Sequence, residues 1–264
     1  MFQNNYSFLL ALTALFSCKS TDYVGKRNEV SACFAPDIAF HGGERLTYKL
    51  YYNLSAVWVA AGEVDFSVSE EGQQYHIVAE GKTYPSYDKI FKVNDRYETY
   101  IDRHTMLPSV SLREVHEGNY NLYDKVIFNQ KEHSAISLRG NSASTTTQTA
   151  HEIENCMHDL LSIIYFSRNV DFKNLPKGSY FPISIFMDKK ALPLQILYKG
   201  TDDALKVKGR KKTKALLFAA QTEKGRIFPD DAEVNIWVSD DEHHTPLMIE
   251  SPLSVGSVKA ILKN

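Results

Sequence analysis

Apolar and polar residues alternate through most of the chain, with the period of two that is typical of half-buried β-strands. Leu46, Tyr48 and Leu50, for example, alternate with Thr47 and Lys49. Turn residues separate such segments at intervals of about 8–12 residues, which favours an antiparallel meander over parallel βαβ units. The pattern therefore predicts an all-β, antiparallel and strongly curved or barrel-like fold. The expected strands cover residues 46–52, 57–62, 64–68, 75–81, 90–102, 108–115, 119–129, 134–138, 181–187, 193–198, 214–222, 232–239, 245–252 and 254–262.

One segment breaks this alternation. Between residues 151 and 168 the apolar positions recur at intervals of three and four, which indicates one buried face of a helix. Thr149, at the end of a polar loop expected at 141–149, is a candidate N-cap, with Glu152 as its capping-box partner. We therefore expect one α-helix at about 151–168, packed against the sheet. Its apolar face comprises Ile153, Cys156, Leu160, Leu161, Ile164 and Tyr165.

The N-terminus carries a short apolar run, at residues 8–17, that ends at Cys18. A helix of about ten residues is roughly 15 Å long, half the thickness of a bilayer, so the run has the length of a signal-peptide core and not of a membrane span. Its ending, Leu15-Phe16-Ser17-Cys18, resembles a bacterial lipobox, in which Cys18 is lipidated and becomes the first mature residue. The alternatives are cleavage as an ordinary secretory signal and a frayed apolar terminus without a targeting role.

The rest of the chain is interpreted as a short tether followed by one folded domain. Residues 18–37 are polar with little periodicity, and the strand pattern begins shortly after them, so we expect a signal peptide at 1–17, a tether at 18–37 and a single β-rich domain at 38–264. A hydrophobic content of 43% and a charged content of 23% are those of a globular protein. The formal net charge of −2 offers no basic surface for nucleic acid.

The chain has three cysteines. If Cys18 carries lipid, Cys33 and Cys156 remain as an even pair in an oxidising compartment, and we expect them to form a disulfide. Such a bridge would close a loop of about 120 residues and stabilise the fold by up to about 4–5 kcal/mol. Two buried free thiols are the alternative.

Several short motifs occur in a fixed order along the body: GERLTY at 43–48, FKVNDR at 91–96, HDLLS at 158–162, WVSDD at 237–241 and VGSVKA at 255–260. Together they resemble the domain of unknown function 3108 family, in its Bacteroides-group form, over roughly residues 38–262. The resemblance implies a secreted, β-rich protein of the Gram-negative envelope and no established activity. With the leader, it predicts a periplasmic protein that is anchored in the outer membrane through lipid.

No catalytic, metal-binding or cofactor motif emerges, so we do not expect an enzyme. His151-Glu152 opens like the zinc motif His-Glu-x-x-His, but Asn155 occupies the place of the second histidine. The acidic segment 240–244 is better explained as a hairpin turn, in which Asp side chains bind backbone N–H groups, than as a calcium site. No Gly-x-Ser-x-Gly elbow or phosphate-binding loop is present.

Aromatic residues are the remaining functional signal, because they occur on both faces of three successive strands. One set would face the core, and the other would be covered or form a binding surface. Tyr52, Trp58 and Trp237 are the candidate ligand-binding residues. Two hypotheses follow: a binding or carrier module for a hydrophobic ligand or lipoprotein, with an apolar concavity, or a structural and interaction lipoprotein with a filled interior. Lipid or an envelope protein is the expected partner in either case.

Overall fold

The computed structural model describes residues 39–54, 57–170, 172, 175–207, 212–221, 233–253 and 256–263. These residues form one antiparallel sheet of fourteen strands, in the order β8-β7-β6-β5-β4-β3-β2-β1-β14-β13-β12-β11-β10-β9. The sheet therefore consists of two meanders, β1–β8 and β9–β14, that are joined where the first strand pairs with the last. The strands are β1 (Arg45–Leu54), β2 (Val57–Glu71), β3 (Gln74–Thr83), β4 (Asn94–Asp102), β5 (Pro108–Glu117), β6 (Tyr120–Asn129), β7 (Ser134–Gly140), β8 (Thr147–Glu152), β9 (Tyr180–Met187), β10 (Lys190–Leu205), β11 (Thr213–Gln221), β12 (Glu233–Ser239), β13 (Pro246–Pro252) and β14 (Ser257–Leu262).

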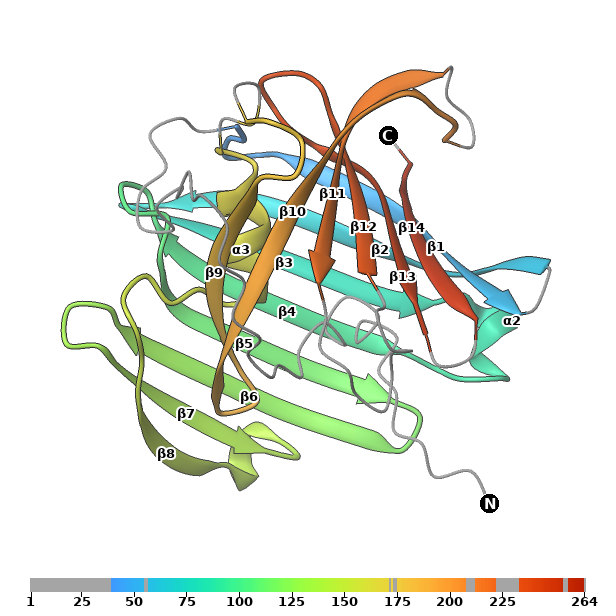
Figure 1. Ribbon diagram of the computed structural model, residues 1–264. Coiled ribbons are helices and arrows are strands. Elements are labelled where there is room, and N and C mark those ends of the chain that lie inside the picture. Colours follow the sequence, from blue (N-terminus) through green and yellow to red (C-terminus); the bar gives the residue numbers. More distant parts are fainter. Residues whose placement is uncertain are drawn as a thin grey trace.

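The alternation in sequence corresponds to an alternation in burial. Along β3, for example, Tyr75, Ile77 and Ala79 are buried while their neighbours are partly exposed. The sheet curves so that its second meander crosses in front of the first, with one helix between them (Figure 1). The inward side chains of both meanders and of this helix form one large apolar core. The predicted all-β, antiparallel and curved fold is confirmed.

The two outer strands, β8 and β9, do not pair with each other, but the segment that follows β8 connects them. The backbone N–H of His158 donates to the carbonyl of Ser184 on β9 at 3.0 Å, and the N–H of Phe186 donates to the carbonyl of His158 at 2.7 Å. A small apolar cluster covers this junction, formed by Val126, Phe128, Ala135, Ile153, Met157 and Phe186. The curved sheet is thus held in a nearly closed form without a complete ladder.

A buried ionic cluster stabilises the same junction. Arg113, Asp124 and Arg139 form a row across β5, β6 and β7, where Asp124 pairs with both guanidinium groups. Asp188, in the β9–β10 turn, reaches this row: its Oδ1 lies 2.7 Å from Arg113 Nη2 and 2.6 Å from Arg139 Nη1. Burial alone would raise the pKa of Asp188, but the charges of Arg113 and Arg139 outweigh it and lower that pKa.

The predicted helix exists, but it is shorter than expected. Helix α3 spans Leu160–Ser167, and a second, one-turn helix, α2, spans Pro85–Asp88. The predicted first turns are instead strand β8, which pairs with β7, and an irregular segment in which Cys156 has a φ of 57° that no α-helix contains. Thr149 is therefore not the N-cap of a helix. The last residues of the expected polar loop, 147–149, belong to strand β8 instead. The apolar spacing of these residues favours a helix, but their hydrogen bonds to β7 make them a strand.

Asp159 fixes where the helix begins. Its Oδ1 accepts the backbone N–H groups of Leu161 and Ser162 at 2.8 and 3.1 Å, which satisfies two of the free donors of the first turn. Its Oδ2 accepts the hydroxyl of Thr99 on β4 at 2.6 Å. Burial raises the pKa of Asp159, and these hydrogen bonds partly offset the increase. The cap therefore anchors the N-terminus of α3 to the first meander.

The ionic junction gives a testable prediction. Asp188→Asn should lower the free energy of unfolding by about 1–2 kcal/mol, between the values for exposed and buried pairs, because Asp188 is only partly covered. Asparagine tolerates the left-handed φ of 52° at this position, so the turn itself is retained. Urea denaturation measures the change. Lys189→Asn, in the same turn, is the matched control, and equal effects of the two substitutions would contradict the proposed role of Asp188.

Candidate functional site

An apolar cavity lies between helix α3 and the second meander. Its volume is about 110 Å³, within an empty space of about 890 Å³ that includes the part open to solvent. Strands β9–β13 supply most of its wall, and helix α3, the residues that follow it and the β12–β13 turn supply the rest. The lining residues are Leu160, Ile163, Ile164, Ser167, Arg168, Phe172, Phe181, Ile183, Leu194, Ile196, Phe218, Ala220, Val234, Ile236, Val238, His244, Pro246 and Ile249.

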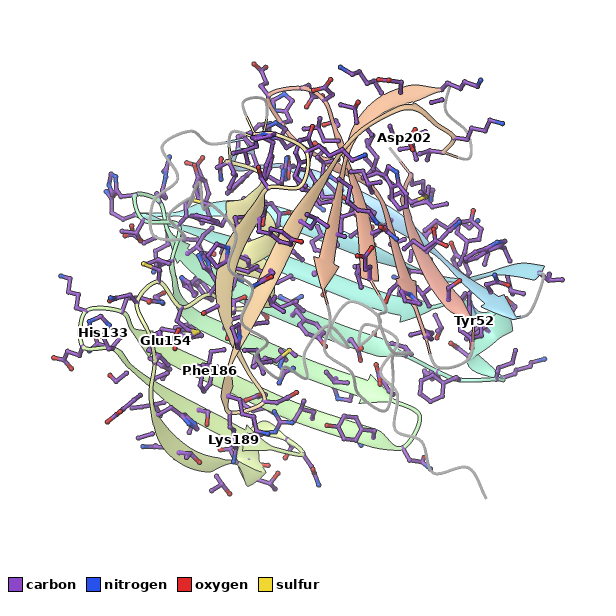
Figure 2. All side chains as sticks on the ribbon, viewed as in Figure 1. Tyr52, His133, Glu154, Phe186, Lys189 and Asp202 are labelled. Carbon is purple, nitrogen blue, oxygen red and sulfur yellow. The ribbon has the colours of Figure 1, made fainter. Side chains whose placement is uncertain are left out.

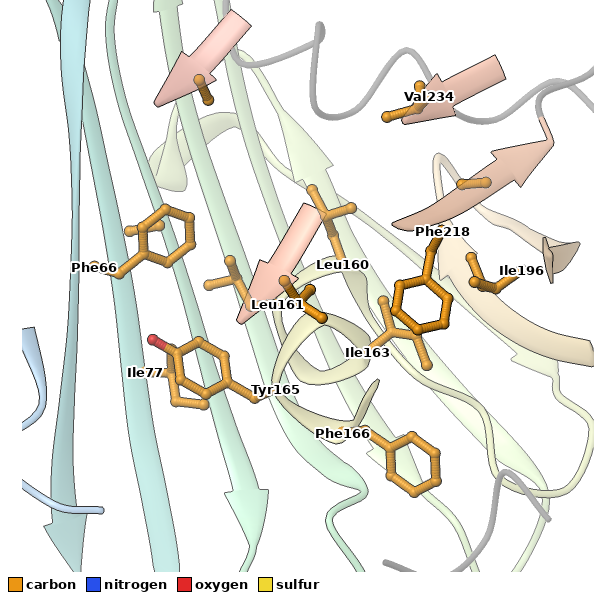
Figure 3. Packing of buried hydrophobic residues seen from close by; sticks show 14 of the residues in the cluster. Phe66, Ile77, Leu160, Leu161, Ile163, Tyr165, Phe166, Ile196, Phe218 and Val234 are labelled. Atoms are coloured by element: carbon orange, nitrogen blue, oxygen red, sulfur yellow. The ribbon is translucent and has the colours of Figure 1, made fainter. Parts of the chain in front are cut away.

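Helix α3 divides the interior of the curved sheet. In Figure 3, Ile163 faces Phe218 of β11, while Tyr165 lies on the opposite side of the helix, toward Phe66 of β2. The side toward the first meander is filled more completely, since the void there is only about 30 Å³. The free space of the core is therefore concentrated on the side of β9–β13.

Arg168, just after α3, holds the C-terminal end of the helix in place and lines the cavity. Its guanidinium forms a bidentate pair with Glu44, with Nη1–Oε1 and Nη2–Oε2 distances of 2.6 and 2.9 Å. Nη2 also donates to the carbonyl of Ala39 at 3.1 Å, and Nε donates to that of His243 at 3.0 Å. This one side chain therefore connects the helix, the start of β1 and the β12–β13 turn.

His244 is the second polar group at the cavity wall. It lies in the β12–β13 turn, only 8% exposed, with its ring packed edge-on against Phe172 at 5.7 Å. Its Nδ1 donates to the backbone carbonyl of Arg168 at 2.7 Å, since a carbonyl can only accept. Its Nε2 is buried and makes no hydrogen bond. The cavity is thus lined by apolar side chains except for Ser167, Arg168 and His244, and among these His244 has a ring nitrogen without a hydrogen-bond partner.

The three predicted ligand-binding residues do not line this cavity. Tyr52 and Trp58 lie on the β1–β2 hairpin, where Lys259 Nζ sits 4.5 Å from the centre of the Trp58 ring. Trp237, on β12, donates its Nε1–H to Asp202 at 3.1 Å. Figure 2 shows Tyr52 and Asp202 at separate places on the molecule. The three aromatic residues chosen from the sequence therefore lie away from this cavity, and their role in ligand binding stays a prediction.

The cysteine predictions concern residues that the structure describes only in part. Cys18 and Cys33 lie outside the described residues. Cys156 lies in the turn between β8 and α3 and is half-buried. Lipidation of Cys18 and the Cys33–Cys156 disulfide therefore stay predictions.

Within the described parts of the chain, no three His, Cys, Asp or Glu side chains converge as metal ligands would. His151 bonds the Ser137 hydroxyl at 2.8 Å, and His158 packs against Phe166 with ring centres 4.8 Å apart. Asp241 accepts the backbone N–H of His243 at 2.9 Å, as expected of a hairpin turn. Among the described helices, none is both long and apolar enough to cross a membrane.

Arg168 and His244 are the polar residues of the site that the sequence did not identify. Arg168 was readable as a favourable charge at a helix C-terminus, but its partner Glu44 is more than a hundred positions away. His244 belongs to a charged turn that resembles any solvated hairpin end. Nothing in the sequence indicated that its ring turns inward.

The fold and the cavity define a β-barrel-like protein with an apolar interior. The chain belongs to the family described as "Protein of unknown function (DUF3108)", which matches residues 47–263. Its structure is similar to that of a beta-barrel-like protein of domain of unknown function DUF1849 from Brucella abortus, with a TM-score of 0.57 and 10% identity over 83% of this chain and 94% of that one. A comparison with curated proteins finds no match. The structural similarity shows a shared fold.

A pair of carboxyl groups is buried away from the cavity, at the ends of β4 and β5. Asp95 and Glu117 are both almost fully buried, and Asp95 Oδ1 accepts the backbone N–H of His116 at 2.8 Å. Burial and the adjacent Glu117 carboxylate raise the pKa of Asp95 to about 9. The Asp95–Glu117 pair therefore retains a proton in the folded state that an unfolded chain would have released.

This pair predicts a pH dependence of stability. Because only the folded state retains the proton, the contribution of this carboxyl pair to stability should fall as the pH rises from about 4 toward the raised pKa of Asp95. Asp95→Asn mimics the protonated form and removes that loss, so its stability relative to wild type should increase across this window. Thermal unfolding of both proteins at a series of pH values tests this. A difference that stays constant with pH would contradict it.

Proposed function

We propose that this protein is a non-catalytic binding or carrier module for a hydrophobic ligand of the cell envelope. The observation that carries the proposal is the apolar cavity between α3 and β9–β13. Ligand sites are concave, mostly apolar and equipped with few polar groups, and this cavity has that character. Ser167, Arg168 and His244 are the polar residues of its lining.

The free-energy cost of leaving the cavity empty favours the binding of a ligand there. Unfilled apolar space costs about 24 cal/mol per Å³ in proteins, so a cavity of 110 Å³ costs about 2–3 kcal/mol. Water gains little there, because the wall supplies very few hydrogen-bonding groups. An alkyl chain would fill the space, regain dispersion contacts with the wall and bury its own apolar surface.

Filling the cavity with a side chain tests this proposal. Ile196, at the centre of β10, contributes to the wall, so Ile196→Trp should weaken binding of a fluorescent fatty-acyl probe by at least about tenfold. Ile196→Phe is the milder version if the tryptophan variant does not fold. Ile127→Trp, at a 40% exposed position on β6, is the matched control and should bind as wild type. Equal affinity of the folded Ile196 and Ile127 variants would contradict a ligand in this cavity.

The location is part of the same proposal: an exported protein that is anchored to the outer membrane, on its periplasmic side, through Cys18. The support is the leader sequence, whose apolar run ends at Cys18 in a lipobox-like segment. Cys18→Ala should then appear in the soluble periplasmic fraction, whereas wild type should remain with the membranes. Soluble wild-type protein in the periplasm would contradict the lipid anchor and leave export intact.

The alternative is a structural or interaction lipoprotein, and one surface favours it. The tip of the β1–β2 hairpin exposes Val57, Trp58 and Val59 by 63, 38 and 37%. Val57 and Val59 lie on one face of β2 and Trp58 on the other, and such exposed apolar side chains offer a contact to protein or lipid. Pull-downs from the envelope with wild type and with a Val57→Ser, Val59→Ser variant distinguish the two functions. Partners that depend on the tip, together with unaltered acyl-probe binding to the Ile196→Trp variant, would favour the alternative.

A further inference from the structure

We propose that the ligand is a single-chain amphiphile with an uncharged hydroxyl headgroup, and that this hydroxyl donates a hydrogen bond to His244 Nε2. The inference rests on the proposed binding function and specifies its ligand class. Long-chain alcohols and monoacylglycerols belong to this class. The alkyl chain would occupy the space lined by α3 and β9–β13, and the headgroup would lie at the end formed by the β12–β13 turn.

The unpartnered nitrogen carries the argument. The Nδ1–H of His244 is fixed by the Arg168 carbonyl at 2.7 Å, and in the neutral imidazole this leaves Nε2 as an acceptor. That acceptor is buried and has no partner. A buried acceptor without a donor costs about 1–3 kcal/mol, and most buried polar atoms in proteins avoid this cost. A hydroxyl group bound in the cavity would remove it.

The imidazole is held in place for such a contact. Its backbone has a φ of 40°, and the turn around it is fixed by two hydrogen bonds at 2.9 Å: Asp241 Oδ1 accepts the His243 N–H, and Ser239 Oγ accepts the Thr245 N–H. The ring is packed against Phe172, as described above. A preorganised acceptor loses little entropy when a ligand binds.

The charges around the cavity argue against an anionic headgroup. Arg168 is the cation at the wall, but its Nε, Nη1 and Nη2 atoms already donate to His243, Glu44 and Ala39. Glu44 also neutralises its charge. The hydroxyl of Ser167 donates to the carbonyl of Ile163. A carboxylate would enter this apolar space beside a cation that Glu44 already neutralises, with only the second N–H of Arg168 Nη1 left to bind it, which is costly.

Matched ligands test the inference on the unaltered protein. Isothermal titration calorimetry at about pH 8 compares decanol, decyl methyl ether and decanoate. All three have the same alkyl chain, but only the alcohol can donate to Nε2. Decanol should bind about five- to tenfold more tightly than the ether, and decanoate should bind most weakly.

A variant assigns the preference to His244. Asparagine tolerates a positive φ and can donate its side-chain N–H to the Arg168 carbonyl, but it places no ring nitrogen at the cavity. His244→Asn should therefore reduce the preference for alcohol over ether to about onefold and keep the affinity for the ether. His243→Asn, at the adjacent and largely exposed position, is the control and should keep the wild-type preference.

The outcomes separate the inference from the function on which it rests. If none of the three compounds binds, the proposed hydrophobic site is wrong, and the headgroup assignment is overturned with it. If alcohol and ether bind wild type equally, or if decanoate binds most tightly, the hydroxyl assignment is overturned while the hydrophobic site stands. A preference for alcohol that survives in His244→Asn also overturns the role of Nε2.

Discussion

The bidentate pair between Arg168 and Glu44 is the interaction on which the interior of this protein depends. It fixes the end of α3 to the start of β1, and the Nε of Arg168 donates to the carbonyl of His243 in the β12–β13 turn. Removing one partner of such a buried pair costs about 3–5 kcal/mol, because the other charge is left uncompensated. With Asp159 anchoring the other end to Thr99, the helix is immobilised across the curved sheet. Because both ends of α3 are held in this way, the helix does not shift toward β9–β13 and fill the cavity.

The open ladder of the sheet explains how an interior of this kind is possible. A fully closed small barrel fills its core with its own side chains, whereas this sheet curves around a helix. Its outer strands are joined by the His158 bridge, an apolar cluster around Phe186 and the ionic row that includes Asp188. These contacts lie only at the junction of β8 and β9. They therefore leave space between the helix and the part of the second meander that contains Phe218 and Val234.

The sequence predicted the strands well, because alternation is imposed locally by a sheet with one buried face. It misplaced the start of the helix, because pairing of His151 and Glu152 with β7 is a long-range effect. The sequence could not predict the site for the same reason: Arg168 and Glu44 meet only through the fold, and His244 is oriented by a hydrogen bond to the backbone carbonyl of Arg168, 76 positions away. Tyr52, Trp58 and Trp237 were chosen for residue type, which says nothing about the face on which they lie.

The central claim is that the space beside α3 is a ligand site. The most direct measurement is an isotope-filtered NOE experiment on protein with labelled Ile and Val methyl groups, in the presence of decanol. The account predicts NOEs from the alkyl chain to the methyl groups of Ile163, Ile196 and Val234, which line the cavity. NOEs confined to the exposed Val57 and Val59 would contradict it, since they would place the ligand on the hairpin tip.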